Sequence, residues 1–447
     1  MLRLELRSSV SRRPIVWWAV RGLAVTVLAA VASGQSDPGV RTGPAGAGGF
    51  LPNLTPAQQT FFNEGLDAFQ EIDFVQNPPA GADAGLGPRF NLDSCAGCHA
   101  FPAVGGSSPA INPQIAVATK LGARNTVPPF ITLNGPVREV RFIKKPDGSP
   151  DGGVHDLFVI SGRSDAGACN IRQEDFSNTS NLSFRIPTPT FGAGLIEAVS
   201  DTSIRQNMAA NSFLKGALGI RGKLNTNGND GTITRFGWKA QNKSLHIFAG
   251  EAYNVEQGVS NMVFPQERDE TPGCVFTGGF EDGIDTMTEL DDATLFAGFM
   301  RFLAPPARGP ITPSVQDGAN IFNAIGCAFC HTPSLQTGLN SMAVLSNKPV
   351  PLYSDLAVHN MGDNLADDIS QGLAGGDEFR SAPLWGLGKR IFFLHDGRTT
   401  DLTKAIEEHF ALPSRQYGPS EANGVILLYR VLPRDQKQHL LDFLRSL

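Results

Sequence analysis

The chain has 447 residues, 41% of them hydrophobic, and its formal net charge is −6. This length and hydrophobic content exclude a chain that is disordered throughout and are enough for two or three domains with real cores. The acidic balance, without a basic run after the N-terminal segment, argues against a nucleic-acid partner. Gly (49) and Pro (31) are abundant, which predicts long turn-rich connections between helices.

Residues 1–34 have the pattern of a signal peptide. Several arginines precede an apolar run over residues 15–32, and small residues follow it. Arg21 interrupts the run, which argues against a retained membrane anchor. We therefore expect cleavage near residue 34, a mature form that does not span the membrane, and a periplasmic location. Residues 35–50, rich in Gly, predict a flexible linker.

The first predicted helix begins at Pro56, with Thr55 as its N-cap. Apolar residues at Phe62, Leu66 and Phe69 follow at i, i+4 and i+7. They share one helical face, so this helix should pack against a core.

The next feature is a C-x-x-C-H motif, Cys95–His99, which occurs again as Cys327–His331. In this motif each thiol can add to a haem vinyl group, and the adjacent His can ligate the iron. A structural zinc or a redox dithiol would need the cysteines alone, and neither explains a His after both pairs. We therefore predict two covalently bound haems c, attached through Cys95, Cys98, Cys327 and Cys330 and ligated by His99 and His331.

Two runs rich in β-formers, residues 137–143 and 154–160, flank a turn-rich segment. They predict a small β-hairpin inserted in the first half. His155, on the second run, has no supporting pattern and is expected to be structural rather than a ligand. Cys169 and Cys274 remain; an oxidising compartment would allow a disulfide, and two buried free thiols are the alternative.

The first half should close with a helix that begins at Asp292 and ends before Pro305. The second half repeats this plan, because an apolar stripe from Val315 to Phe322 leads into the second motif and Pro433 opens a terminal helix. We therefore predict a mainly α fold with two cytochrome c-like haem domains and long loops. The N-terminal domain, with the inserted hairpin, should span residues 51–305 and the C-terminal domain residues 306–447.

A shorter echo relates Pro189–Gly194 to Pro383–Gly388. Glycine allows close approach of backbone, so these segments are expected to lie against a flat macrocycle.

The sixth ligand of each iron decides whether the haem transfers electrons or reacts with small oxidants. In residues 402–409, Leu402, Ile406 and His409 fall on one helical face. A His at the end of an apolar stripe is ordinarily a partly buried side chain. Because a haem in this half needs an axial group, we predict that His409 ligates the second iron.

Several segments resemble the bacterial di-haem cytochrome c peroxidases and the related MauG enzymes, and most of all the branch called di-haem oxidoreductases. The resemblance covers nearly the whole chain after residue 51. The segments that carry it are Cys327–His331, Tyr353–Leu356, His359–Gly362 and Leu394–Arg398 in the second half, and Gly162–Cys169, Phe191–Ala198 and Phe236–Gln241 in the first.

The resemblance implies a ligand of the second haem some four helical turns after the His-Asp-Gly at His395, and that spacing also reaches His409. A haem with two His ligands should have a lower potential than one with His and Met. The first haem should be open, since no His occurs between His99 and His155. By resemblance Glu256 is the acid-base catalyst, and Glu197 is the runner-up.

The resemblance also implies an aromatic residue between the haems. The aligned position is Phe236, and Trp238 is close enough to serve; Trp238 is our choice. A calcium site between the haems is implied as well, but its Thr and Pro positions are Arg390 and Phe392 here. Calcium is therefore a possible cofactor by resemblance, although these two residues depart from the pattern of the resembling proteins.

These features together predict an exported di-haem peroxidase that reduces hydrogen peroxide at the His99 haem. The second haem would relay electrons from a small redox protein or another donor. Two alternatives remain open from the sequence: an electron-transfer cytochrome without a catalytic site, and an oxygenase or MauG-like enzyme that oxidises another substrate.

Overall fold

The computed structural model describes residues 35–80, 82–87, 89–124, 126–155, 158–159, 162–266, 271–274, 279–284 and 288–447. The predicted signal peptide lies outside these ranges. Residues 35–447 group as one unit by their contacts, and the division of this unit at residue 305 stays a prediction.

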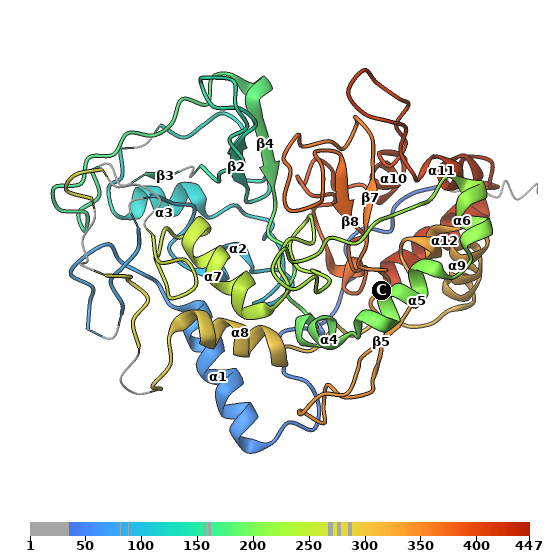
Figure 1. The fold of residues 1–447 in the computed structure, drawn as a ribbon, viewed down its shortest axis with the longest axis horizontal. Helices are drawn as coiled ribbons and strands as arrows, with labels where there is room; N and C mark the ends of the chain where they lie inside the picture. The colour runs from blue at the N-terminus through green and yellow to red at the C-terminus, as the bar shows by residue number, and fades with distance from the viewer. Residues whose placement is uncertain are drawn as a thin grey trace, which may run out of the picture. The chain divides into compact units, whose positions relative to one another are not determined.

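Two crossing helices organise the first half of the chain. Helix α1 (Pro56–Gln70) begins with a capping box between Thr55 and Gln58, and α8 (Asp292–Phe302) is capped by Asp291. The two helices touch where α1 carries Gly65, because a Cβ there would lie 2.3 Å from the carbonyl oxygen of Leu295. Both predicted helices are therefore confirmed, and they lie side by side (Figure 1). Because Gly65 has no side chain, the two backbones can approach closely there.

The second half contains the same crossing. Helix α9 (Pro313–Ala324) packs on α12 (Arg434–Ser446), and a Cβ on Gly318 would lie 1.9 Å from the carbonyl oxygen of His439. In both halves, the phenylalanine four residues after the glycine packs at a tilt against a phenylalanine of the closing helix. The centroids of Phe69 and Phe299 are 4.9 Å apart, and those of Phe322 and Phe443 are 5.2 Å apart.

The other elements are short and connect these helices. The remaining α-helices are α2 (Cys95–Cys98), α3 (Gln114–Lys120), α4 (Ala193–Ala198), α5 (Asp201–Ala209), α6 (Ser212–Leu218), α7 (Leu245–Glu256), α10 (Leu402–Glu407) and α11 (Asn423–Arg430). The 3-10 helices are η1 (Thr179–Asn181), η2 (Cys327–Phe329) and η3 (Leu387–Lys389). The strands are β1 (Arg89–Phe90), β2 (Glu139–Phe142), β3 (Phe158–Val159), β4 (Leu182–Arg185), β5 (Leu335–Gln336), β6 (Pro349–Val350), β7 (Val358–Asn360) and β8 (Glu378–Arg380).

Among the described residues the strands form antiparallel pairs, β1 with β3, β2 with β4, β5 with β6 and β7 with β8. The fold is thus mainly helical with small sheets, as expected. The two runs of the predicted hairpin meet at the isolated antiparallel bridge between Val140 and His155, and residues 156, 157 and 160 lie outside the described residues, so the hairpin stays a prediction. The sequence did not predict the four-residue ladder of β2 with β4, which sets Val140 opposite Phe184 and so gains an apolar cross-strand pair.

The glycines of the echo lie against helix backbone. A Cβ on Gly194 would lie 1.9 Å from the carbonyl oxygen of Arg301 in α8, and one on Gly388 would lie 2.0 Å from that of Arg445 in α12. These glycines therefore bring the two turns against the closing helices, and the expected contact with a macrocycle stays a prediction.

Cys169 and Cys274 form a disulfide. Both sulfurs lie in a cluster of buried apolar residues that also contains Val75, Leu86 and Phe90. The disulfide resolves the alternative that the sequence left open. Within the described ranges, no helix is long and apolar enough to cross a membrane.

Replacing Gly318 by Ala should destabilise the protein, because the new methyl group would overlap the backbone of α12. We expect the free energy of unfolding to fall by about 1–3 kcal/mol or more, as in other overpacked cores. Denaturant unfolding followed by far-ultraviolet circular dichroism measures this.

The matched control is Gly216→Ala in α6, where an added Cβ would meet nothing within 4 Å. That change should be neutral or stabilise by up to about 1 kcal/mol, because Ala is the better helix former. Equal effects of the two substitutions would contradict the role given to Gly318.

Candidate active site

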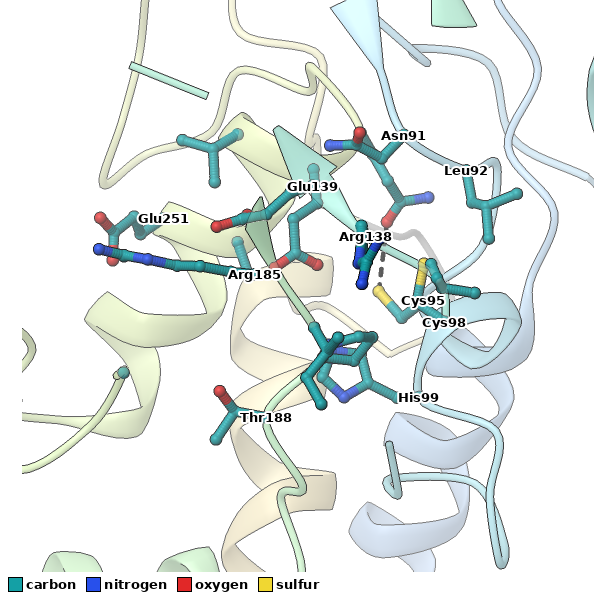
Figure 2. A pocket seen from close by; sticks show the side chains of 18 of the residues that line it. Asn91, Leu92, Cys95, Cys98, His99, Arg138, Glu139, Arg185, Thr188 and Glu251 are labelled. Atoms are coloured by element: carbon teal, nitrogen blue, oxygen red, sulfur yellow. Dashed lines mark hydrogen bonds between the residues drawn. The ribbon is translucent and has the colours of Figure 1, made fainter. Parts of the chain in front are cut away.

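The first C-x-x-C-H motif lines a cavity of about 810 Å³, which we call the N-terminal cavity. Cys95, Cys98 and His99 lie on one side of it, and Arg185 and Glu251 lie on the opposite side (Figure 2). Helix α2 is a single turn made of the four residues Cys95–Cys98, and this turn brings both thiols to the same cavity.

The imidazole of His99 is held ready to act as a ligand. Its Nδ1 lies 3.1 Å from the carbonyl oxygen of Gly106, and the ring of Phe69 meets it edge-on at 5.9 Å between centroids. Burial lowers the pKa of His99 to about 4, against the opposing effect of the Gly106 carbonyl. The ring is therefore neutral at pH 7, and with Nδ1–H donating to the carbonyl its Nε2 lone pair is left for a metal.

Glu256 lies in the same cavity, as the last residue of α7. Burial raises the pKa of the Cys95 and Cys98 thiols well above the usual value, and the next largest cause is the charge of Glu256. Its carboxylate is thus close to the motif. Gln257, the next residue, accepts a hydrogen bond from the Cys95 sulfur at 3.2 Å.

The N-terminal cavity has further charged residues that sequence reasoning missed. Glu139 pairs with Arg141 at 3.1 Å, and Glu251 accepts a hydrogen bond from Asn242. Glu139 and Arg141 belong to β2, which pairs with β4, and both line the same cavity as the motif. They lie about 40 residues after the motif in the sequence, and no local pattern predicts that they line its cavity.

Glu197, the runner-up for the acid-base role, does not line this cavity. Its carboxylate accepts a hydrogen bond from the backbone N–H of Leu245 at 2.8 Å and pairs with Arg301 at 2.9 Å. It stabilises the start of α7 and joins it to α8. A carboxylate among apolar neighbours therefore has a structural explanation here.

The second motif lines a larger cavity of about 1390 Å³, which we call the C-terminal cavity. His331 and His409 both line it, together with Cys327 and Cys330. The Nδ1 of His331 lies 3.2 Å from the carbonyl oxygens of Tyr353 and Ala382, and that of His409 lies 2.7 Å from that of Ala405.

The two imidazoles influence each other. Burial lowers the pKa of His331 to about 4, and the second cause is the nearby His409. Burial also lowers the pKa of His409. Two neutral rings, each with Nδ1 directed at a carbonyl, present two Nε2 lone pairs to one cavity.

Other groups in the C-terminal cavity are less suited to bind a metal. Both ring nitrogens of His359 are occupied, Nδ1 by Glu421 at 2.9 Å and Nε2 by Asp355 at 3.0 Å. His395 stacks on Phe379, with 4.3 Å between the ring centroids. His155 pairs with Asp151 and lines neither cavity.

Trp238 lines both cavities. Its indole N–H donates to the carbonyl oxygen of Ile186 at 3.1 Å. Phe236 stacks on Phe248 and lines neither cavity. Of the two candidates for an aromatic bridge, the structure therefore puts Trp238 between the motifs.

A buried ion network runs beside Trp238. Asp367 pairs with Arg185 at 2.6 Å and with Lys239 at 2.8 Å, and all three side chains are at most 2% exposed. Arg185 lines the N-terminal cavity. Lys239 lies 4.0 Å from the ring centroid of Phe379, which lines the C-terminal cavity. The network thus joins the walls of the two cavities.

The side chains at the two positions implied for calcium, Arg390 and Phe392, carry no oxygen. Arg390 lines the C-terminal cavity, and Phe392 lines a small cavity of about 310 Å³ beside it. In the described part of the chain, no group of three or more His, Cys, Asp or Glu side chains is arranged to hold a metal ion.

Comparison with known families and structures identifies the class. The family model described as "Di-haem oxidoreductase, putative peroxidase" matches residues 153–447, well over half of the chain. The chain therefore belongs to this family of di-haem oxidoreductases, whose cofactors are haems. No curated protein sequence matches the chain.

Solved structures with similarity include a MauG-like protein associated with microbial copper homeostasis, at 18% identity over 35% of this chain and 52% of that chain, with a TM-score of 0.25. The chain thus spans about half the length of that protein. Another is the diheme peroxidase BthA from Burkholderia thailandensis E264, at 12% identity over 58% and 86% of the two chains, with a TM-score of 0.30. A third is hydrazine synthase of Kuenenia stuttgartiensis, at 18% identity over 39% and 59%, with a TM-score of 0.24.

The residues present fit haem. Each cavity brings together two thiols and at least one neutral imidazole whose Nδ1 is bound to a carbonyl. This is the donor set that attaches and ligates a haem of the c type.

Replacing Asp367 by Asn should strongly destabilise the protein, because Arg185 and Lys239 would lose their shared carboxylate inside the fold. We expect a loss of about 3–5 kcal/mol in the free energy of unfolding, measured with denaturant. Burial opposes ionisation, but Arg185 and Lys239 hold the pKa of Asp367 below 3.8. Its contribution is therefore present above pH 3.8 and lost as the pH falls through the folded-state pKa.

The control is Glu407→Gln, which removes the half-exposed pair with Arg430. That pair should be worth less than about 1 kcal/mol. A loss for Asp367→Asn no greater than that of the control would contradict the importance of the network.

Proposed function

We propose that the protein is an exported di-haem c peroxidase that reduces hydrogen peroxide to water in the N-terminal cavity. Cys95 and Cys98 would attach one haem and Cys327 and Cys330 the other, each through thioether bonds. The observation that carries the proposal is the inequality of the two cavities. Of the described residues, the C-terminal cavity has two imidazoles ready to ligate, whereas His99 is the one imidazole in the N-terminal cavity.

The sixth position therefore differs between the two sites. In the C-terminal cavity His331 and His409 would both hold the haem iron, which suits electron transfer. In the N-terminal cavity the described lining includes no second His, and no Met or Tyr, to close the site. Haem iron with an open position supplies peroxide binding and cleavage of the O–O bond when it is present.

Glu256 is the acid-base catalyst in this proposal. Its carboxylate accepts the proton from one peroxide oxygen and returns it to the other, which leaves as water. The complete reaction consumes two electrons and two further protons and forms two waters from each peroxide. Trp238, which lines both cavities, provides the route for electrons between them.

The electrons would come from a small redox protein or another donor that delivers them at the C-terminal site. The disulfide between Cys169 and Cys274 supports export, because such bonds persist in oxidising compartments such as the periplasm. Calcium has no part in the proposal, since a guanidinium and a phenyl ring stand at the positions implied for its ligands.

The spin states of the oxidised protein test the assignment of ligands. We expect an EPR spectrum with one high-spin and one low-spin haem. In His409→Ala the low-spin signal should become high-spin, because one axial ligand is removed. The control His395→Ala changes another His of the same cavity and should keep the low-spin signal. Two low-spin haems in the parent protein would favour a pure electron-transfer cytochrome.

Replacing Glu256 by Gln should slow the reaction with peroxide by about 10²–10⁴-fold, since general acid-base catalysis typically contributes that much. Stopped-flow spectra of the all-oxidised protein mixed with peroxide measure the rate, and EPR checks that the haems are unchanged. Glu197→Gln is the matched control and should react at the parent rate. If Glu197→Gln reacted slowly with peroxide and Glu256→Gln reacted at the parent rate, the acid-base role would belong to Glu197. If the spectrum of the parent protein did not change on mixing with peroxide, the peroxidase function would be contradicted.

A further inference from the structure

Two arginines line the C-terminal cavity without any acidic partner. Arg380 ends β8 and is only 5% exposed, and Arg390 follows η3 and is partly buried. Among the described residues, the one hydrogen-bond partner of the Arg380 guanidinium is the carbonyl oxygen of Gly237, to which its Nε–H donates at 3.0 Å. The Arg390 guanidinium makes no hydrogen bond or ion pair with any described residue.

The wall around these two arginines does not balance their charge. The described residues that line the C-terminal cavity include no Asp and no Glu, and most of them are aliphatic or aromatic. In the N-terminal cavity Arg141 and Arg185 are paired with Glu139 and Asp367, and the third lining arginine, Arg138, donates to the backbone carbonyl oxygen of Asp396 at 2.9 Å. Three glutamates also line that cavity. Of the two cavities, the C-terminal one is therefore the one whose described lining combines unpaired arginines with no carboxylate.

The two guanidiniums also lie close enough to repel each other. Burial and, after it, the charge of Arg390 lower the pKa of Arg380 to about 10. Burial alone lowers the pKa of Arg390 to about 10. Both groups are still protonated at pH 7, so two like charges stay in a largely apolar cavity. Such charges are costly unless an anion accompanies them.

We propose that Arg380 and Arg390 form an anion site for the propionate carboxylates of the haem in the C-terminal cavity. Guanidinium groups bind carboxylates with two parallel hydrogen bonds, and haem carries two carboxylates on an otherwise apolar ring. The site rests on the proposed haem occupancy but not on peroxide as the substrate. It accounts for both arginines and for the lack of acidic residues around them.

The site also has a link to Trp238. The backbone N–H of Arg380 donates to the carbonyl oxygen of Trp238 at 2.8 Å, beside the contact of its side chain with Gly237. Arg380 therefore joins the anion site to the segment that lines both cavities. A cation held near a haem favours the reduced state, because reduction removes positive charge from the iron.

The test is a redox titration of the two haems in the holoprotein. In Arg380→Gln and in Arg390→Gln the low-spin haem should be harder to reduce, with its ratio of reduced to oxidised form at least threefold lower at the parent midpoint potential. The high-spin haem should shift less. The double variant should show a larger change than either single variant, and Arg380→Lys, which keeps the charge, should return most of the parent behaviour.

Arg398→Gln is the matched control, because its guanidinium pairs with Asp396 beside His395 and does not line the cavity. It should leave the low-spin haem within the error of the parent. Unchanged potentials in Arg380→Gln and Arg390→Gln, with both haems still present, would overturn the propionate site. A parent potential that responds to added phosphate would overturn it too, because the arginines would then hold a free anion.

The haem content separates this inference from the proposed function. A pyridine haemochrome assay that finds two haems, together with a normal reaction with peroxide and unchanged potentials, rejects the propionate site alone. A parent protein that does not react with peroxide, together with shifted potentials in Arg380→Gln and Arg390→Gln, rejects the peroxidase proposal and keeps the site.

Discussion

Contact between two helix backbones at a glycine is the constraint on which the rest of the structure depends. Gly65 lets α1 meet α8, and Gly318 lets α9 meet α12, at distances that a Cβ would prevent. In each half a phenylalanine four residues later then packs on the closing helix. The C-x-x-C-H motif comes after this opening helix, so the crossing determines where each motif enters the fold.

The same architecture thus supports two cavities of different chemistry. Both present thiols and a neutral imidazole that is oriented by a carbonyl, and this part of the design is repeated. The differences come from the segments around the repeat. Strand β2 brings charged residues to the N-terminal cavity, whereas the end of α10 adds His409 to the C-terminal one. A shared frame with different inserts therefore gives two cavities whose lining residues differ in charge and in the number of imidazoles.

The cavities are joined by two kinds of contact, one aromatic and one ionic. Trp238 lines both cavities. The buried Asp367 pairs with Arg185, which lines the N-terminal cavity, and with Lys239, which lies against Phe379 of the C-terminal cavity. Because the network is almost wholly buried, its geometry is sensitive to the loss of any member. The surroundings of Trp238 are accordingly held by residues that are distant in the sequence, and the backbone N–H of Arg380 also donates to the carbonyl oxygen of Trp238.

The sequence by itself determined the features that depend on short spacing. These are the capped helices and the two C-x-x-C-H motifs, because capping and motif spacing act within a few residues. His409 was expected on the face of a helix over residues 402–409, but α10 ends at Glu407 and His409 lies in the turn that follows. Only the tertiary structure decided which distant residues meet. The tertiary structure pairs β2 with β4 and places the Glu197 carboxylate at the start of α7. It also puts Trp238, and not Phe236, in the lining of both cavities, and it places Arg380 and Arg390 in a cavity whose described lining has no Asp or Glu. Such outcomes depend on packing between segments many tens of residues apart, which no local pattern records.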